Sequence, residues 1–201
     1  MVAPAPGAAV FLDRDGTLID DSGYPSDPGH VRLVPHVAPV LAELELWGVP
    51  RILVTNQSGI ARGMLTEEDY ARVHARLVEL LAAAGASLTA EYHCPHHPDF
   101  SGDCDCRKPS TAMFLRAAAE HSLDPGASLF VGDRWRDVAP GIELGGMALL
   151  VPSPGTPPDE THRAAAEGRV AASLADAVTR WRGTIRDRGP GSGARFAGGA
   201  Q

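Results

Sequence analysis

A chain of 201 residues is long enough to bury one substantial core without disulfide staples, so we expect a single domain. Its 44% hydrophobic and 21% charged content is typical of a soluble globular protein, and no apolar run approaches the roughly 20 residues of a membrane span. The net charge of −7 argues against a nucleic-acid partner, but it leaves room for a phosphate ligand beside local cations and a metal. Residues 1–9 lack the basic and apolar regions of a secretory signal, which predicts a cytoplasmic protein.

An apolar run at residues 8–12 predicts a buried strand, and it leads directly into Asp13, Arg14, Asp15 and Gly16. Residues i and i+2 of an extended strand face the same way, so we expect Asp13 and Asp15 to share one crevice while Arg14 points elsewhere. Two such carboxylates repel each other unless a cation compensates them, and Mg²⁺ prefers carboxylate, water and phosphate oxygens. In isolation the same residues also fit an ordinary solvated turn.

The next stretch alternates helix and strand patterns. Apolar residues recur at helical spacing over 37–44, and the continuous apolar run 52–54 predicts a second buried strand. Residues 66–69 resemble a capping box, with Asp in the place of the usual Glu, and open a second helix that closes at Gly85. A short strand over 90–94 follows.

In the C-terminal half, Ser110 is placed to cap a third helix, and apolar runs at 129–131 and 147–151 predict two more strands. Strands that alternate with helices of this length indicate an α/β fold with a parallel sheet covered on both faces. Ligands of such sheets bind outside the carboxyl ends of the strands. Three strand ends carry polar residues that suit a phosphate and a metal: Asp13 with Asp15, Thr55 with Asn56, and Asp133.

The rest of the chain is expected to add little to the site. Residues 152–158 form a Pro-rich connection, and residues 173–181 predict a last helix. From Gly183 onward the composition is Gly, Arg and Ser with little to bury. We therefore expect one domain over 1–182 and a disordered tail over 183–201.

Four motifs occur in order, each at a predicted strand end or helix start: Asp13-x-Asp15-Gly16-Thr17, Val54-Thr55-Asn56-Gln57-Ser58-Gly59, Arg107-Lys108-Pro109 and Gly132-Asp133-x-x-x-Asp137. Together they resemble the haloacid dehalogenase (HAD) superfamily of phosphatases, which implies a Rossmann-like (HAD) parallel sheet. Within it, residues 55–63 and 94–98 look like the D-glycero-D-manno-heptose 1,7-bisphosphate phosphatases, with the histidinol-phosphate phosphatases as the alternative.

The residue types agree with phosphoryl transfer. A carboxylate nucleophile forms a mixed anhydride that water can cleave, so one hard hydrolysis becomes two easier steps. We assign Asp13 as nucleophile and Asp15 as general acid and base, with Thr55 and Lys108 holding the equatorial phosphoryl oxygens. The resemblance implies that Mg²⁺ bridges Asp13, Asp133 and a phosphate oxygen, with the backbone carbonyl of Asp15 as a further ligand. Thr55 and Lys108 also have plainer interpretations, as a β-branched strand residue and a solvated loop charge.

Further residues are expected around the phosphate. Asp137 orients Lys108 or the metal waters, unless it only favours a helix N-terminus through the macrodipole. Asp21 and Tyr24 bind sugar hydroxyls or belong to a plain turn, and the sequence leaves both alternatives open. The resemblance gives Arg107 a role in recognising the rest of a sugar phosphate. The full set of expected substrate contacts is Asp21, Tyr24, Thr55, Asn56, Gln57, Ser58, Arg107 and Lys108.

Four soft or borderline metal ligands lie in two close pairs, Cys94 with His96 and Cys104 with Cys106. This set suits a tetrahedral Zn²⁺ in a zinc-binding loop, and four protein ligands make the site structural. All three cysteines of the chain are used, and a cytoplasmic location argues against a disulfide. His93 and His97 flank the ligands and compete with His96, which the family pattern favours.

The spacing of the motifs leaves no room for a large cap domain, and an uncapped crevice accepts a phosphate on the end of a sizeable sugar. The sequence therefore predicts a monomeric, Mg²⁺-dependent phosphatase for the 7-phosphate of heptose 1,7-bisphosphate, with histidinol phosphate as the alternative substrate. A zinc-stabilised binding protein with a dead site is the alternative of a different class. The intact Asp13, Asp15 and Asp133 weigh against it.

Overall fold

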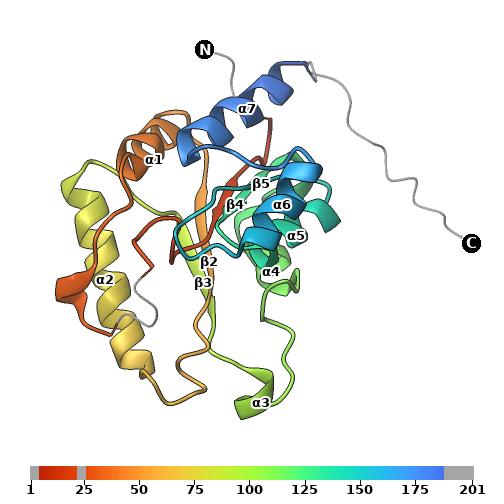
Figure 1. The fold of residues 1–201 in the computed structure, drawn as a ribbon. Helices are drawn as coiled ribbons and strands as arrows, with labels where there is room; N and C mark the ends of the chain where they lie inside the picture. Colours follow the sequence, from red (N-terminus) through yellow and green to blue (C-terminus); the bar gives the residue numbers. More distant parts are fainter. Residues whose placement is uncertain (1–4, 22–25, 188–201) are drawn as a thin grey trace, which may run out of the picture.

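A computed structural model describes residues 5–21 and 26–187 and contains one five-stranded parallel sheet (Figure 1). The strands, in the order β3-β2-β1-β4-β5, are β1 (Val10–Leu12), β2 (Arg51–Asn56), β3 (Ala90–Cys94), β4 (Leu129–Gly132) and β5 (Met147–Leu150). The helices are α1 (Val37–Leu46), α2 (Glu67–Ala83), α3 (Pro98–Ser101), α4 (Ala112–His121), α5 (Trp135–Glu143), α6 (Pro158–Ala166) and α7 (Leu174–Asp187). Short 3-10 turns lie at η1 (Pro28–His30) and η2 (Pro125–Ala127). The predicted α/β class with a parallel sheet is confirmed.

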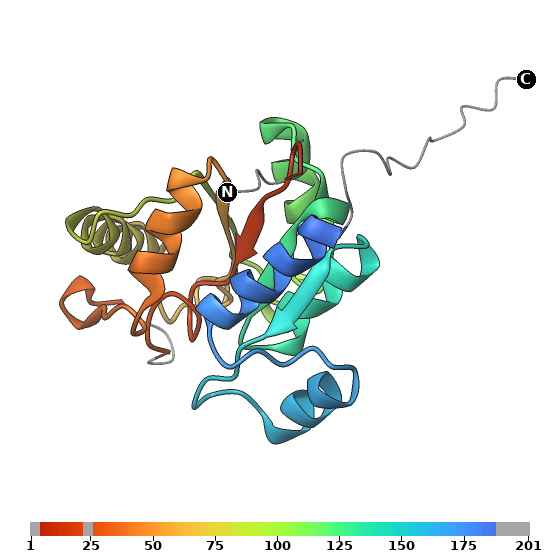
Figure 2. The ribbon, with the colours of Figure 1, turned by 90° about the horizontal axis from the view of Figure 1, so that it is seen from above.

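Side chains of the strands alternate between two apolar cores, one on each face of the sheet. On one face Val10 and Leu12 pack with α1, α2 and α7, and on the other Phe11 packs with α4, α5 and α6. The ring centroid of Phe11 lies 4.7 Å from that of Phe130 and 5.5 Å from that of Phe114. Figure 2 shows orange α1 and green α4 on opposite sides of red β1. The sheet is therefore covered on both faces, which explains the continuous apolar runs in β1, β2, β4 and β5.

The central position of β1 creates a site at the carboxyl edge of the sheet. The chain passes from β1 to β2 on one side and later returns through β4 on the other. Asp13 follows β1 and Asp133 follows β4. These two strands are adjacent, and their register pairs Leu12 with Val131. Both carboxylates consequently emerge at one topological switch point, where open α/β sheets bind ligands.

Capping residues in the sequence predict two helix starts, of which one is confirmed and the other is shifted by one residue. The predicted capping box opens α2: Thr66 Oγ1 accepts a hydrogen bond from Asp69 N at 3.0 Å, and Asp69 Oδ2 accepts one from Thr66 N at 2.8 Å. The N-cap of α4 is Thr111 rather than the predicted Ser110. The Ser110 hydroxyl still accepts a hydrogen bond from Ala112 N at 3.3 Å, so it satisfies one donor of that helix start.

The sequence does not predict α3 or α6. The first has four residues, and the second buries only Ala164, so it lacks the apolar stripe that identifies a helix. Helix α7 continues to Asp187, past the boundary at Gly183 where disorder is expected, and it is anchored by Trp181, whose indole N–H donates to Ala127 O at 3.0 Å. The rest of the predicted tail, 188–201, lies outside the described residues.

Among the described elements, the connection from β1 to β2 holds η1 and α1, and the connection from β3 to β4 holds α3, α4 and η2, so this part of the chain carries no large cap domain. That agrees with the expectation of an uncapped fold. None of the helices in 5–21 and 26–187 is both long and apolar enough to cross a bilayer.

Candidate active site

Three buried carboxylates converge at the carboxyl edge of the sheet. Asp13 follows β1, Asp133 follows β4, and Asp137 lies in the first turn of α5, and their oxygens lie within 4.8 Å of one another. Each residue is at most 6% exposed. Buried carboxylates this close repel one another unless cations compensate them. The sequence predicts Asp13 and Asp133 as ligands of one metal and Asp137 beside Lys108 or the metal waters, and the structure brings all three carboxylates together.

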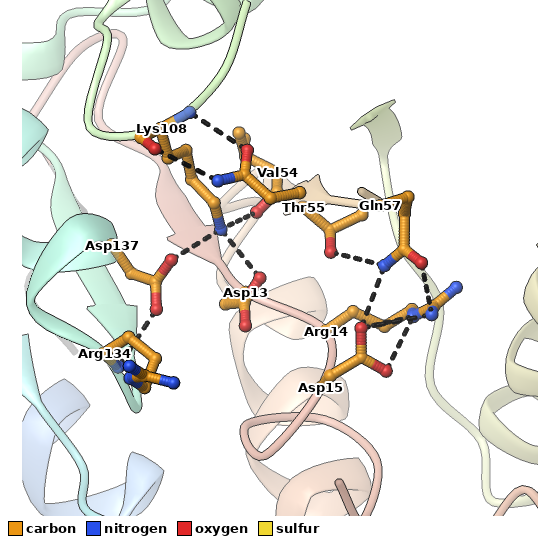
Figure 3. A network of polar contacts seen from close by, with 10 residues as sticks. Asp13, Arg14, Asp15, Val54, Thr55, Gln57, Lys108, Arg134 and Asp137 are labelled. Carbon is orange, nitrogen blue, oxygen red and sulfur yellow. Dashed lines mark hydrogen bonds and ion pairs between the residues drawn. The ribbon is translucent and has the colours of Figure 1, made fainter. Parts of the chain in front are cut away.

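Lys108 supplies one compensating charge (Figure 3). Its Nζ lies 2.7 Å from Asp13 Oδ1 and 2.7 Å from Asp137 Oδ1, and it donates a hydrogen bond to Val54 O at 2.6 Å. Burial disfavours the ammonium form, but the carboxylates of Asp13 and Asp137 outweigh that effect and raise the pKa of Lys108. Lys108 is 2% exposed, so its interpretation as a solvated loop charge is wrong.

The last residue of β2 holds Lys108 in place. Asn56 donates a hydrogen bond from Nδ2 to Lys108 O at 3.1 Å, and its Oδ1 accepts one from Lys108 N at 3.0 Å. The hydroxyl of Thr55 is buried and accepts a hydrogen bond from Gln57 Nε2 at 2.9 Å. The amide of Asn56 therefore fixes the backbone of Lys108, a role that the motif alone does not reveal.

Asp137 combines both interpretations that the sequence leaves open. Its Oδ1 pairs with Lys108, and its Oδ2 accepts a hydrogen bond from Arg134 N at 3.0 Å and so caps α5. Burial, followed by the charge of Asp13, raises the pKa of Asp137 against the opposing effect of Lys108. A Cβ at Gly132 would overlap with the Asp137 side chain, which explains the glycine at the end of β4.

Asp133 is oriented by the loop after β5. Ser153 Oγ donates to Asp133 Oδ2 at 2.6 Å, and Thr156 Oγ1 donates to the backbone carbonyl of Asp133 at 2.7 Å. Burial, then the charges of Asp13 and Asp137, outweigh the hydrogen bond from Ser153 and raise the pKa of Asp133 to about 7. Sequence reasoning missed Ser153 and Thr156. The strand-end rule applied to β5 would have pointed to them.

Asp15 makes its contacts on another side of the site (Figure 3). Its carboxylate accepts hydrogen bonds from Arg14 Nε at 3.2 Å, Arg14 Nη2 at 3.1 Å and Gln57 Nε2 at 2.9 Å. The expectation that Arg14 points away from Asp15 is wrong. Strand β1 ends at Leu12, so the alternation of side chains in a strand no longer applies at these positions. Gly16 continues the turn with a φ of 80°, and a Cβ there would overlap with the Asp133 carboxylate.

The four predicted zinc ligands also converge, with all donor atoms within 4.8 Å of one another. Cys104 Sγ lies 3.7 Å from Cys94 Sγ and 3.6 Å from Cys106 Sγ. His96 Nδ1 lies 3.7 Å from Cys94 Sγ and 3.2 Å from Cys106 Sγ. A tetrahedral site with Zn–S bonds of about 2.3 Å has sulfur–sulfur edges of about 3.8 Å, so these separations suit zinc.

One sulfur contact differs from the expectation. Cys94 and Cys106 form a disulfide in this structure, and Cys104 is the free cysteine of the described residues. The argument against a disulfide rested on the use of all three cysteines as zinc ligands and on the expected compartment. The fold brings the two Cα atoms to 5.5 Å, a separation that allows a disulfide as well as a shared metal.

The competing histidines lie outside this cluster. His93 Nε2 lies 3.1 Å from Glu67 Oε2, and His97 Nε2 lies 2.7 Å from Arg62 Nη2. Of the three histidines in this stretch, His96 alone contributes to the group of convergent donors.

The remaining predicted contacts that the structure describes lie in loops around the same edge. Arg107 Nη1 donates to His96 O at 3.1 Å, which ties this arginine to the Cys/His loop. Ser58 is buried in the loop after β2. Asp21 is exposed, with its carboxylate beside Gly155 of the loop after β5. Tyr24 lies outside the described residues.

Known proteins are similar to this chain in sequence. A family model described as HAD-hydrolase-like matches residues 105–177. The D-glycero-β-D-manno-heptose-1,7-bisphosphate 7-phosphatase of Yersinia pestis is 41% identical over 174 residues, which cover 84% of this chain and 92% of that protein. The enzyme of the same name from Haemophilus influenzae is 42% identical over 138 residues, or 67% of this chain and 75% of that protein.

Solved structures share the fold as well. The D,D-heptose 1,7-bisphosphate phosphatase of B. bronchiseptica, complexed with magnesium and phosphate, superposes with a TM-score of 0.76 at 28% identity, covering 88% of this chain and 99% of that one. A HAD-like phosphatase from Mesorhizobium loti gives a TM-score of 0.76 at 32% identity, with coverages of 96% and 92%. With the carboxylates and Lys108 gathered at the switch point of the same sheet, the chain belongs to the HAD family of phosphatases.

Proposed function

We propose that the protein removes the 7-phosphate of D-glycero-D-manno-heptose 1,7-bisphosphate, with Mg²⁺ and through an aspartyl-phosphate intermediate. The observation that carries the proposal is the buried Asp13 carboxylate, held 2.7 Å from Lys108 at the carboxyl edge of the sheet. The names of the relatives from Y. pestis and H. influenzae support the substrate. An uncapped fold suits a phosphate on the end of a sugar, and a cytoplasmic monomer is the proposed setting.

The chemistry proceeds in two displacements at phosphorus. A carboxylate oxygen of Asp13 attacks, the bond from phosphorus to the sugar oxygen breaks, and Asp15 protonates that oxygen. Water then attacks the phosphorus, Asp15 takes its proton, and the bond to Asp13 breaks to release inorganic phosphate. Thr55 and Lys108 stabilise the charge that develops on the equatorial oxygens in both steps.

The cluster formed by the carboxylates of Asp13, Asp133 and Asp137 fits a Mg²⁺ ion. Three buried carboxylates share one directly paired ammonium, and a hard divalent cation prefers such oxygens. Asp13, Asp133 and the backbone carbonyl of Asp15 would hold the ion, which supplies positive charge to the phosphoryl oxygens when bound. The magnesium and phosphate in the B. bronchiseptica structure support this assignment.

A structural Zn²⁺ in the Cys/His loop completes the proposal. Apart from the Cys94–Cys106 pair, the separations between the donors suit a tetrahedral site, four protein ligands leave no open position, and three thiolates with one imidazole suit zinc. In a reducing cytoplasm Cys94 and Cys106 would be thiolates bound to the metal rather than a disulfide. Such a metal would hold the loop that delivers Arg107 and Lys108.

A phosphate-release assay tests the substrate and the mechanism together. We expect heptose 1,7-bisphosphate to be hydrolysed with a higher kcat/KM than fructose 1,6-bisphosphate or histidinol phosphate. Asp13→Asn should keep the fold and eliminate turnover, because an amide is not a competent nucleophile. The matched control is Asp159→Asn, which makes the same change at an exposed carboxylate of α6. Retention of a tenth of the wild-type activity by Asp13→Asn would contradict the mechanism, and a preference for histidinol phosphate would contradict the substrate.

A further inference from the structure

The two oxygens of the Asp15 carboxylate have unequal surroundings. Oδ2 accepts three hydrogen bonds, from Arg14 Nε at 3.2 Å, Arg14 Nη2 at 3.1 Å and Gln57 Nε2 at 2.9 Å. Oδ1 accepts one, from Arg14 Nε at 3.2 Å. The side chain of Asp15 remains 19% exposed, while that of Arg14 is 1% exposed. The carboxylate is therefore anchored through Oδ2, and Oδ1 is the oxygen that can still accept further hydrogen bonds.

Arg14 is itself held by two other parts of the fold. Its Nη2 donates to Gln57 Oε1 at 3.0 Å, in the loop after β2, and its guanidinium carbon lies 5.0 Å from the ring centroid of Tyr70 on α2. A planar guanidinium fixes the plane of the carboxylate that it binds, which an ammonium does not. Arg14 is thus held by the loop after β2 and by α2, and it in turn fixes the position of the Asp15 carboxylate.

Gln57 links this anchor to the site of phosphoryl transfer. Its Nε2 donates both to Asp15 Oδ2 at 2.9 Å and to Thr55 Oγ1 at 2.9 Å (Figure 3). Thr55 is one of the residues assigned to the phosphoryl oxygens. The side-chain amide of Gln57 therefore sets the distance between Thr55 and the acid, Asp15.

We propose that Arg14, with Gln57, is the positioning residue of the acid–base step: it holds Oδ2 of Asp15 and leaves Oδ1 as the oxygen that exchanges the proton. The inference rests on the proposed function of Asp15. In the first displacement the proton on Oδ1 passes to the sugar oxygen as its bond to phosphorus breaks, and in the second Oδ1 takes a proton from the attacking water. Arg14 touches neither substrate nor phosphorus in this role, and it acts through Asp15.

The test compares two leaving groups. A sugar oxygen needs protonation as it leaves, whereas p-nitrophenolate does not, and kcat/KM reports only the steps up to formation of the aspartyl phosphate. A misplacement of about 1 Å costs on the order of 100-fold in rate. We therefore expect Arg14→Lys and Arg14→Met to lower kcat/KM for the sugar phosphate by about 100-fold, and that for p-nitrophenyl phosphate by less than about 5-fold. Arg14→Lys keeps the positive charge but loses the planar guanidinium that binds the carboxylate through two nitrogens. It should therefore not restore kcat/KM for the sugar phosphate.

Arg51 provides the matched control. It is another buried arginine, 7% exposed, and its hydrogen bonds go to Ser87 and Val49 at the opposite edge of the sheet. Arg51→Met should lower the melting temperature without changing the ratio of the two kcat/KM values. Circular dichroism and melting temperature identify an Arg14 variant that fails to fold. In that case the double variant Arg14→Met/Asp15→Asn, in which no unpaired carboxylate remains, takes its place.

The outcomes separate this inference from the proposed function. In the Asp15→Asn background the Arg14→Met change should cost nothing further on the sugar phosphate, because the acid is already lost. Equal losses on both substrates for the Arg14 variants, full activity in Arg14→Lys, or an additional loss in the double variant would overturn the positioning role alone. If Asp15→Asn itself lost equal activity on both substrates, the acid role of Asp15 would fail, and the positioning role would fail with it.

Discussion

Lys108 Nζ and Asp13 Oδ1 lie 2.7 Å apart, although 95 positions separate the two residues in the chain. The lysine arrives at the end of the Cys/His loop, where Asn56 holds its backbone, and the aspartate arrives on the central strand. The proposed nucleophile and its cation are therefore placed by two different structural units. A change in either unit should therefore alter the distance between Lys108 and Asp13.

Lys108 is the single lysine of the chain, so ¹³C-labelled lysine reports on this site alone. Its pKa is raised above 10.5 in the native protein, because the carboxylates of Asp13 and Asp137 outweigh burial. The stability from these ion pairs is fully present below the pKa of the unfolded state and is lost as pH rises through the native pKa. We expect the native ¹³Cε signal to titrate at higher pH than that of the unfolded protein, and Asp137→Asn to bring its titration to lower pH. Native titration below pH 10.5 would show that the ion pairs do not form.

Asp133 should destabilise the metal-free protein at neutral pH. Its pKa rises from 3.8 to about 7 on folding, so the native state binds the proton more tightly, and stability falls as pH increases across this range. We expect metal-free Asp133→Asn to be more stable than wild type at pH 8 by about 2 kcal/mol, and the difference to be much smaller at pH 4. Urea unfolding in chelator measures both. Mg²⁺ should stabilise the wild type and not the variant, and a less stable variant at pH 8 would contradict the prediction.

Ser153 should influence metal binding through Asp133. Its hydroxyl donates to Asp133 Oδ2 at 2.6 Å and orients a proposed Mg²⁺ ligand. Loss of such a partner typically costs 10- to 100-fold in metal affinity, so we expect Ser153→Ala to weaken Mg²⁺ binding by about 10-fold in calorimetric titration. Ser173→Ala, which removes a hydroxyl at the start of α7, is the control. Equal Mg²⁺ affinity in Ser153→Ala and wild type would show that the hydroxyl has no such role.

Zinc content distinguishes the metal site from the disulfide. We expect protein purified under reducing conditions to hold one equivalent of zinc by elemental analysis. After unfolding and removal of the metal, all three cysteines should titrate as thiols. Less than half an equivalent of zinc would contradict the closed four-ligand site. A single titratable thiol would support the pairing of Cys94 with Cys106 instead.

Cys106→Ser tests whether the proposed zinc positions the chemistry. Cys106 lies two residues before Lys108, and the intervening Arg107 is tied to the Cys/His loop through His96 O. A displacement of about 1 Å costs on the order of 100-fold in rate, so we expect Cys106→Ser to lower kcat and raise KM at saturating Mg²⁺. The exposed neighbour Asp105 offers Asp105→Ser as the control. Unchanged kinetics in a zinc-depleted Cys106→Ser would leave zinc with a purely stabilising role.

Periodicity and strand ends were sufficient to predict much of this site. Strands β1, β2, β4 and β5 contain continuous apolar runs because both faces of the sheet are covered, and a parallel sheet gathers its strand ends at one edge. The positions of Asp13, Thr55 and Asp133 follow from that rule. The Thr66–Asp69 capping box is equally local, since its donors and acceptors lie within one turn.

The tertiary structure alone decided how the side chains are paired. Asp15 turns toward Arg14 and Gln57 because strand geometry ends at Leu12, and Asp133 is oriented by Ser153 from a loop that carries no sequence periodicity. The sequence by itself determined which carboxylates reach the carboxyl edge, because strand direction and hydrophobic burial are encoded locally. It did not determine which cation or hydroxyl each carboxylate meets, because those partners come from segments brought together only when the two cores pack against the sheet.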